Sequence, residues 1–149
     1  MANVRPIIFL DFDGTLNSLA VDYRRADPAC VARLNRLTQE TGACIVVSSS
    51  IRISGLRLTV HRLRQWGVKG DVIGLTPWLD RGPGADATRG EEVQAWLDAH
   101  PEVDTFAILD DDDSGMDDLR SHLVQTDPLF GLTDKDVGKA TRILGAGHT

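Results

Sequence analysis

Short apolar runs that alternate with helical stretches constrain the fold of this chain more than any other feature. The runs cover residues 7–10, 44–47, 72–75 and 106–109, and a fifth opens at Leu123 and Val124. Runs of β-forming residues that are separated by helices predict βαβ units and a parallel sheet. We therefore expect a Rossmann-like α/β fold with about five parallel strands.

Two helices are predicted in the first half of the chain. The first covers residues 28–41, where Pro28 suits the first turn and Gly42 suits the stop. The second covers roughly residues 53–66, with one apolar stripe at helical spacing made of Leu56, Val60, Leu63 and Trp66. Residues 76–88 are rich in Pro, Gly and Asp and are expected to form a loop.

Two further helices begin at capping motifs. Thr88 and Glu91 have the spacing of a capping box, and that helix is expected to run to about His100. Thr133 is expected to cap the last helix, with Asp136 at its third position.

Size and composition indicate an ordinary globular protein. The chain has 149 residues, of which 42% are hydrophobic and 26% charged, so a single domain over residues 1–149 is expected. No apolar run approaches the roughly 20 residues of a membrane span, and the start lacks the pattern of a signal peptide. We expect a cytoplasmic protein without a membrane partner, whose two cysteines, Cys30 and Cys44, are buried and reduced.

The distribution of charge is more informative than the net charge of −6. Residues 41–70 contain no acid and carry five cationic side chains, namely Arg52, Arg57, Arg62, Arg64 and Lys69. This segment is either a solvated helix face or a landing surface for a polyanion, and the sequence leaves both interpretations open.

Acidic residues follow the first apolar run, where parallel sheets place their ligands. Asp11 and Asp13 stand two residues apart and Gly14 comes next. Such a pair can hold one hard cation, attack phosphorus and move a proton. The alternatives are an ordinary Asp-Gly turn or a calcium loop, although a calcium loop has its Gly at another position.

Polar residues also follow the second and fourth runs. Ser48, with the two serines after it, can hydrogen-bond a phosphoryl oxygen or simply form a turn. The four acids 110–113 repel one another unless a cation or solvent separates them. An EF-hand reading of this segment fails because Ser121 stands where a bidentate Glu is needed. Arg89, at a helix start, is either a surface residue or a cation for a bound phosphoryl group.

Together these motifs resemble the haloacid dehalogenase (HAD) superfamily of phosphotransferases. Residues 7–15 match the apolar strand followed by DxDGT, and residues 45–48 match the strand that ends in Ser or Thr. Arg89 matches the basic residue of the third motif, and residues 106–111 match the strand that ends in paired acids. The resemblance implies a three-layer α/β/α HAD fold around the parallel sheet.

The resemblance also implies a magnesium site. Asp11 would be a ligand, and Asp13 would contribute its backbone carbonyl. Asp110 and Asp111 would complete the shell, directly or through water. Asp111 is favoured as the direct ligand because it matches the usual metal-binding position, but a run of four acids leaves the choice open.

The same resemblance implies catalytic roles. Asp11 would be the nucleophile and Asp13 the general acid and base, while Ser48 would bind the phosphoryl group and Arg89 would stabilise the aspartyl-phosphate. ATP-driven pumps of the superfamily have Thr at the position of Asp13, and dehalogenases lack this second Asp. The chain is therefore expected to be a phosphatase.

A narrower resemblance is to HAD domains found with, or as parts of, Swiss-army-knife-type RNA repair proteins. It lies in the stretches IFLDFDGTLNS, IVVSSSIR, VIGLTP, RGEEVQAWL, ILDDDDS and TDPLFGLT. A similar serine–arginine arrangement occurs in the phosphatase domain of polynucleotide kinase-phosphatases, which makes Ser49 and Arg52 candidates for substrate binding. Ile51 departs from the pattern, because a Trp is expected before the arginine.

The gaps between motifs bear on the substrate. HAD caps are inserted between the first three motifs, and neither gap here has room for a large cap domain. An open site suits a substrate that supplies its own cover, so a terminal phosphate on RNA, DNA or a nucleotide is expected. A small-metabolite phosphatase and a non-catalytic binding module are the alternatives. The sequence leaves the substrate and the oligomeric state open.

Overall fold

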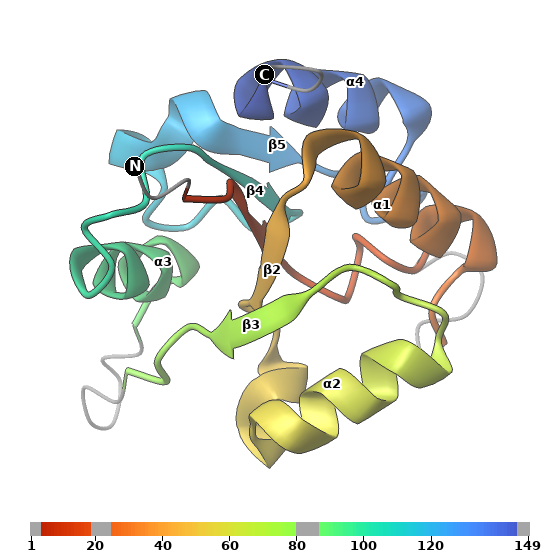
Figure 1. Cartoon of the computed structure of the whole chain (residues 1–149), viewed down its shortest axis with the longest axis horizontal. Coiled ribbons are helices and arrows are strands. Elements are labelled where there is room, and N and C mark those ends of the chain that lie inside the picture. Colours follow the sequence, from red (N-terminus) through yellow and green to blue (C-terminus); the bar gives the residue numbers. More distant parts are fainter. Residues whose placement is uncertain (1–3, 19–24, 80–86, 146–149) are drawn as a thin grey trace.

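The computed structural model describes residues 4–18, 25–79 and 87–145, which form a central parallel sheet between layers of helices (Figure 1). The sheet has five strands in the order β3-β2-β1-β4-β5. Its strands are β1 (Ile7–Leu10), β2 (Cys44–Val47), β3 (Val72–Leu75), β4 (Phe106–Asp110) and β5 (Leu123–Gln125). The predicted α/β class and the number of strands are confirmed.

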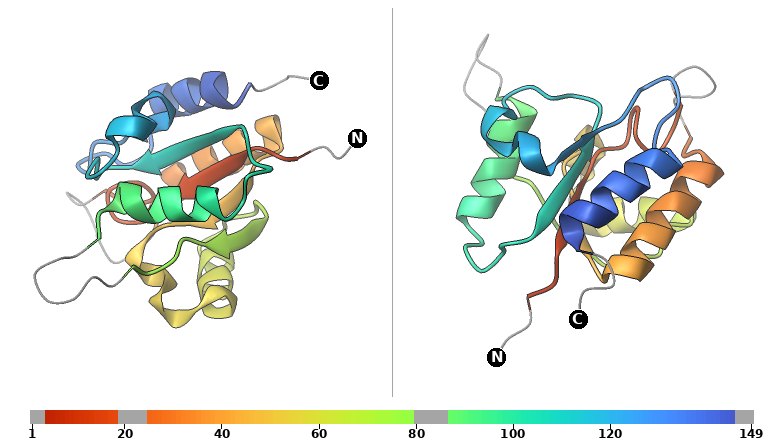
Figure 2. Two further views of the ribbon diagram at one scale, coloured as in Figure 1. Left: turned by 90° about the vertical axis from the view of Figure 1, so that its left-hand side faces the viewer. Right: turned by 90° about the horizontal axis from the view of Figure 1, so that it is seen from above.

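Helices cover both faces of the sheet, as the right-hand view of Figure 2 shows. The helical elements are α1 (Pro28–Thr41), η1 (Ser50–Ser54), α2 (Leu56–Gln65), α3 (Arg89–Asp98), η2 (Asp117–His122) and α4 (Asp134–Leu144). Alternate strand residues face opposite sides. Ile8 and Leu10 pack with residues of α1, α2 and α4, whereas Ile7 and Phe9 pack with α3 and η2. The three-layer arrangement predicted from the sequence is therefore present.

The caps predicted from the sequence begin and end the helices. Gly42 ends α1 in the left-handed conformation, with φ of 71°. Reciprocal capping boxes join Thr88 to Glu91 and Thr133 to Asp136, so both helices begin where local chemistry places them. Helix α3 ends at Asp98, two residues before the predicted end, which is an ordinary boundary difference.

The continuous helix predicted over residues 53–66 is wrong. Gly55 has φ of 88° and separates the 3₁₀-helix η1 from α2. Helix α2 begins only at Leu56, which is 41% exposed. The buried residues of α2 are Thr59 and Leu63. Of the predicted loop 76–88, residues 80–86 lie outside the described part, and the flanking described residues are irregular.

Strand register places the polar residues in one row. Leu10 is opposite Val47 on one side and opposite Leu109 on the other. The residues that follow these three are Asp11, Ser48 and Asp110, so they meet at the carboxyl edge of the sheet. Leu75 of β3 lies beside Val47, which adds Thr76 to the row.

The described residues contain no cap domain. Helix α1 is the only regular element described between β1 and β2, and η1, α2 and β3 are the described elements between β2 and α3. Both cysteines are buried and unpaired, as predicted. None of the helices described is long and apolar enough to cross a membrane.

Candidate active site

The loop after β1 directs three consecutive side chains into different surroundings. Asp11 is 3% exposed and lies at the carboxyl edge of the sheet. Phe12 turns into the core, where its ring stacks on Trp66 with 4.5 Å between centroids. Asp13 is exposed to solvent. One acid is therefore held inside the site, while the second is accessible to an incoming substrate.

Buried polar contacts fix the shape of this loop. The side-chain oxygen of Asn17 accepts a hydrogen bond from the backbone N–H of Gly14 at 2.8 Å. The hydroxyl of Thr126 donates to the carbonyl of Gly14 at 2.7 Å and lies 3.1 Å from the hydroxyl of Thr15. Gly14 has φ of 76°, and a Cβ there would lie 2.6 Å from a carboxylate oxygen of Asp111. Only glycine fits this turn, which lies against the acids after β4.

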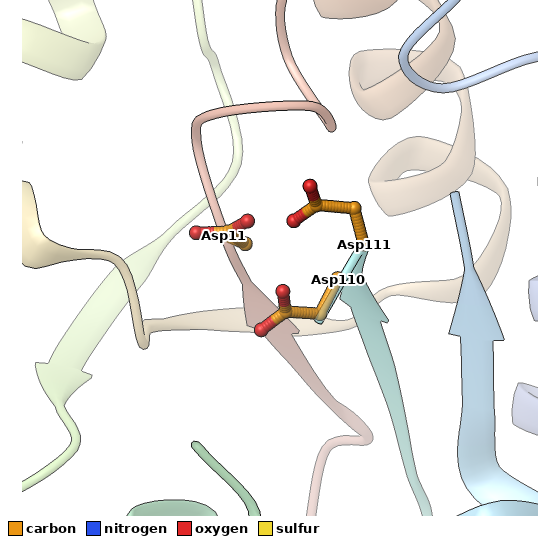
Figure 3. A group of neighbouring side chains, drawn as sticks. All are labelled: Asp11, Asp110 and Asp111. Carbon is orange, nitrogen blue, oxygen red and sulfur yellow. The ribbon is translucent and has the colours of Figure 1, made fainter. Parts of the chain in front are cut away.

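Three carboxylates converge at the carboxyl ends of β1 and β4, as Figure 3 shows. Asp11, Asp110 and Asp111 each offer one oxygen, and these oxygens all lie within 4.8 Å of one another. Asp110 is completely buried, and its Oδ2 atom accepts no hydrogen bond from the described residues. Clustered carboxylate oxygens are the ligands that Mg²⁺ prefers, so this donor set fits the ion.

Burial and neighbouring charges together set the ionisation of this cluster. Burial raises the pKa of Asp11 to about 9, and the nearby carboxylate of Asp110 adds to the rise, while Arg89 opposes it. Burial also raises the pKa of Asp110 to about 6, again against the guanidinium of Arg89. A divalent cation among these oxygens would favour their charged forms.

Arg89 is the first residue of α3 and reaches across the carboxyl edge of the sheet. Its guanidinium lies 3.6 Å from Asp11 Oδ1 and 3.3 Å from Asp110 Oδ2, and it donates a hydrogen bond to the carbonyl of Ser48. Close approach of α3 makes this reach possible, because a Cβ on Gly90 would lie 2.0 Å from the carbonyl oxygen of Gly115. Arg89 is therefore in contact with two of the three acids.

Two buried hydroxyl groups in the same row have no partner among the described residues. They are Ser48 Oγ and Thr76 Oγ1, which follow β2 and β3. A buried hydroxyl without a hydrogen bond is costly, and such groups in native proteins usually have a functional reason. The unpartnered Ser48 hydroxyl is consistent with the predicted phosphoryl contact.

The structure places the two predicted substrate contacts, Ser49 and Arg52, in the wall of the site. Ser49 Oγ accepts the N–H of Ile51 at 3.3 Å and caps η1. Arg52 forms a buried ion pair with Glu92 at 2.6 Å. Its guanidinium also donates to the carbonyls of Ser48, Ser49 and Thr76. These contacts support the ends of β2 and β3.

The four acids after β4 separate into two pairs. Asp110 and Asp111 face Asp11, as predicted for metal ligands. Asp112 accepts the N–H of Ser114 at 2.9 Å, and Asp113 lies 3.3 Å from Arg120, so both are used within their own loop.

A sequence profile of the HAD domain in Swiss Army Knife RNA repair proteins matches residues 7–137. The chain belongs to this family. The five-stranded parallel sheet is consistent with a HAD fold, and family membership identifies the protein as a HAD-type phosphatase. The resemblance to RNA-repair HAD domains noted in the sequence is confirmed. No curated protein and no solved structure matches the chain significantly.

Three residues of this HAD domain were not predicted from the sequence. Thr76 follows a strand just as Ser48 does, so the strand-end rule would have found it. Glu92 stands one turn after Arg89 on α3, but nothing local indicates its pairing with Arg52. Asn17 follows the first motif closely, and its contact with Gly14 is visible only in three dimensions.

Proposed function

We propose that this HAD domain is a magnesium-dependent phosphohydrolase that uses Asp11 as a covalent nucleophile and removes a terminal phosphate from a nucleotide or nucleic acid. The observation that carries the proposal is the row at the carboxyl edge of the sheet. There a buried carboxylate at Asp11 lies between an unpartnered hydroxyl at Ser48 and the acids after β4, in contact with Arg89.

The first half-reaction transfers the phosphoryl group to the protein. A carboxylate oxygen of Asp11 attacks phosphorus, a new P–O bond forms, and the bond to the leaving oxygen breaks. Asp13, the exposed acid two residues on, gives its proton to that leaving oxygen. Ser48 and Arg89 bind the phosphoryl oxygens, on which the negative charge is spread.

The second half-reaction releases phosphate. Asp13, now a carboxylate, takes a proton from water, the water oxygen attacks phosphorus, and the bond to Asp11 breaks. Asp11, Asp110 and Asp111 would hold Mg²⁺, with the backbone carbonyl of Asp13 as a further ligand. Bound Mg²⁺ supplies the positive charge that keeps these buried carboxylates ionised and offsets the charge of the phosphate.

Two observations support a nucleotide or nucleic-acid substrate. The family to which the chain belongs is named for RNA repair proteins, and no cap domain is present in the described ranges to enclose a small substrate. Exposed arginines follow the length of α2, from Arg57 in its first turn to Arg64, which donates to the carbonyls of Val68 and Gly70. Because α2 leads back toward the start of β3, Arg57 lies nearest the site and Lys69 near the opposite edge.

A substrate panel tests the proposal. The purified protein is given oligonucleotides with 3′- or 5′-phosphates, nucleoside monophosphates, sugar phosphates and p-nitrophenyl phosphate, with Mg²⁺ or with EDTA. We expect phosphate release that requires Mg²⁺, is lost in Asp11→Asn, and is fastest on a nucleotide or oligonucleotide. Release from sugar phosphates alone would replace the proposed substrate class, and release from none of the compounds would overturn the enzymatic proposal.

A further inference from the structure

An exposed tryptophan stands at the rim of the active site. Trp78 follows β3 by three residues and is 56% exposed. It lines a pocket of about 320 Å³ together with Arg52, Arg89 and Asp112. Arg89 is also in contact with Asp11, so this pocket opens from the place where the phosphate is expected. Ligand pockets begin at roughly 300 Å³, a size that suits one planar ring system with its attached sugar.

The indole ring of Trp78 packs against Arg52, whose own position is fixed by hydrogen bonds. The guanidinium carbon of Arg52 lies over the ring of Trp78, 4.5 Å from its centroid. Arg52 is fixed by its ion pair with Glu92, and the same carboxylate accepts the N–H of Leu79 at 3.0 Å. Arg52 also donates to the carbonyl of Thr76, so the chain is tied down on both sides of the tryptophan. Arg52 stacks on the ring of Trp78, and more than half of Trp78 remains exposed to solvent.

We propose that Trp78 is a stacking platform for the nucleobase whose phosphate is bound at Asp11. This inference rests on the proposed function and deepens it by assigning the site that recognises the base. Every nucleobase has a π face that stacks on an aromatic side chain without requiring a particular sequence. An arginine that supports the ring and a polar pocket wall suit a base with its sugar better than they suit an aliphatic ligand.

The decisive quantity is the preference for a substrate that carries a base. It is the ratio of kcat/KM for a nucleoside 3′-monophosphate to kcat/KM for ribose 3-phosphate, and the same ratio is measured with a 3′-phosphorylated oligonucleotide. In Trp78→Ala we expect the ratio to fall roughly 10-fold or more, through a higher KM for the base-bearing substrate. Trp78→Phe should keep most of the preference, because its ring still stacks.

Ile73→Ala is the matched control. Ile73 is 50% exposed on the same segment of chain, but it lines a different pocket with Trp96 and His100. Its removal should leave the preference unchanged. If Trp78→Ala lowers the ratio for both the mononucleotide and the oligonucleotide, the platform is supported for either source of the base. If it lowers the ratio for the oligonucleotide alone, the platform is supported for nucleic-acid ends.

Two results separate the inference from the proposed function. If the wild-type protein hydrolyses these phosphates and Trp78→Ala leaves the preference unchanged, the platform is wrong and the phosphatase stands. If the wild-type protein hydrolyses none of them, binding is measured in Asp11→Asn by the quenching of tryptophan fluorescence with a nucleoside monophosphate. Quenching that disappears when Trp78→Phe is added then supports the platform, and equal quenching in both proteins contradicts it.

Discussion

Two buried charged groups lie side by side at the carboxyl edge of the sheet, and they differ in how completely their atoms are paired. Arg52 and Glu92 form a balanced pair, 2.6 Å apart, and their other atoms hydrogen-bond backbone groups of Ser48, Ser49, Thr76 and Leu79. The group of Asp11, Asp110 and Asp111 has three carboxylates, with Arg89 as the cation in contact with Asp11 and Asp110. Asp110 Oδ2 contacts Arg89 but accepts no hydrogen bond from the described residues, and the group lies in the same row as the unpartnered hydroxyl of Ser48.

The comparison distinguishes charged groups that stabilise the fold from charged groups that can take part in chemistry. A buried ion pair with satisfied hydrogen bonds needs nothing more, and removing one partner leaves a charge without compensation. A buried cluster with excess charge and unpartnered atoms is stable only because packing holds it, and a ligand can supply what is missing. The predictions below test this division by measuring activity and stability in the same variants.

Asp11→Asn should have the largest effect on activity. It removes the attacking carboxylate, so kcat should fall at least about 1,000-fold. The metal-free protein should lose no stability, because the raised pKa of Asp11 leaves this buried acid protonated at neutral pH and Asn is its neutral equivalent. Phosphate release and thermal unfolding in EDTA measure both quantities. An active variant would show that Asp11 is not the nucleophile.

Glu92→Ala should have the largest effect on stability. It leaves the guanidinium of Arg52 buried without its partner, which should cost about 3–5 kcal/mol of unfolding free energy. The matched control is Asp71→Ala, which breaks the exposed pair with Arg5 and should cost far less, because solvent screens an exposed ion pair. Denaturant unfolding compares the two variants. Equal losses would contradict the structural role assigned to the buried pair of Arg52 and Glu92.

Ser48→Ala should reduce activity and spare the fold. Its hydroxyl has no partner within the described structure, so the variant should be as stable as the wild-type protein or slightly more stable. If the hydroxyl binds a phosphoryl oxygen, kcat should fall roughly 100-fold. Steady-state kinetics and unfolding are measured on the same sample. A stability loss without a kinetic effect would assign Ser48 to the structural group.

The pH dependence of stability should show the smallest effect. The pKa of Asp11 lies at about 9, above its ordinary value of 3.8, so the metal-free folded chain holds a proton there that the unfolded chain has lost. Unfolding free energy in EDTA should therefore fall as pH rises between those two values. Relative to Asp11→Asn, the wild-type protein should lose roughly 2.7 kcal/mol between pH 6 and pH 8, about 1.36 kcal/mol for each pH unit. Added Mg²⁺ should remove this difference.

The sequence predicted what depends on local chemistry. Strand ends, capping boxes and the glycine stop of α1 were predictable because each uses residues that are adjacent or one helical turn apart. The first and fourth motifs indicated Asp11, Asp110 and Asp111 for the same reason. The break at Gly55 was missed because the apolar spacing suggested one helix, whereas the left-handed φ of this residue is decided by how η1 meets α2.

Contacts between distant segments were not predictable. Glu92 is an ordinary helix residue in the sequence, and only the approach of α3 to η1 brings it to Arg52, 40 positions away. The same packing makes Arg52 a support for the site, and its contact with substrate, which the resemblance implied, stays a prediction. Local patterns thus pointed to the acidic cluster, and tertiary packing formed the pair of Arg52 and Glu92.

The covalent role of Asp11 is tested most directly by trapping the phosphorylated protein. Asp13→Asn slows attack by water but still allows p-nitrophenol, a good leaving group, to depart without a proton. This variant is mixed with p-nitrophenyl phosphate and Mg²⁺, quenched in acid, reduced with borohydride and analysed by peptide mass spectrometry. We predict reduction of residue 11 to homoserine, and no such product when Asp11→Asn is added. A burst of p-nitrophenol with Asp11 unmodified would contradict the account.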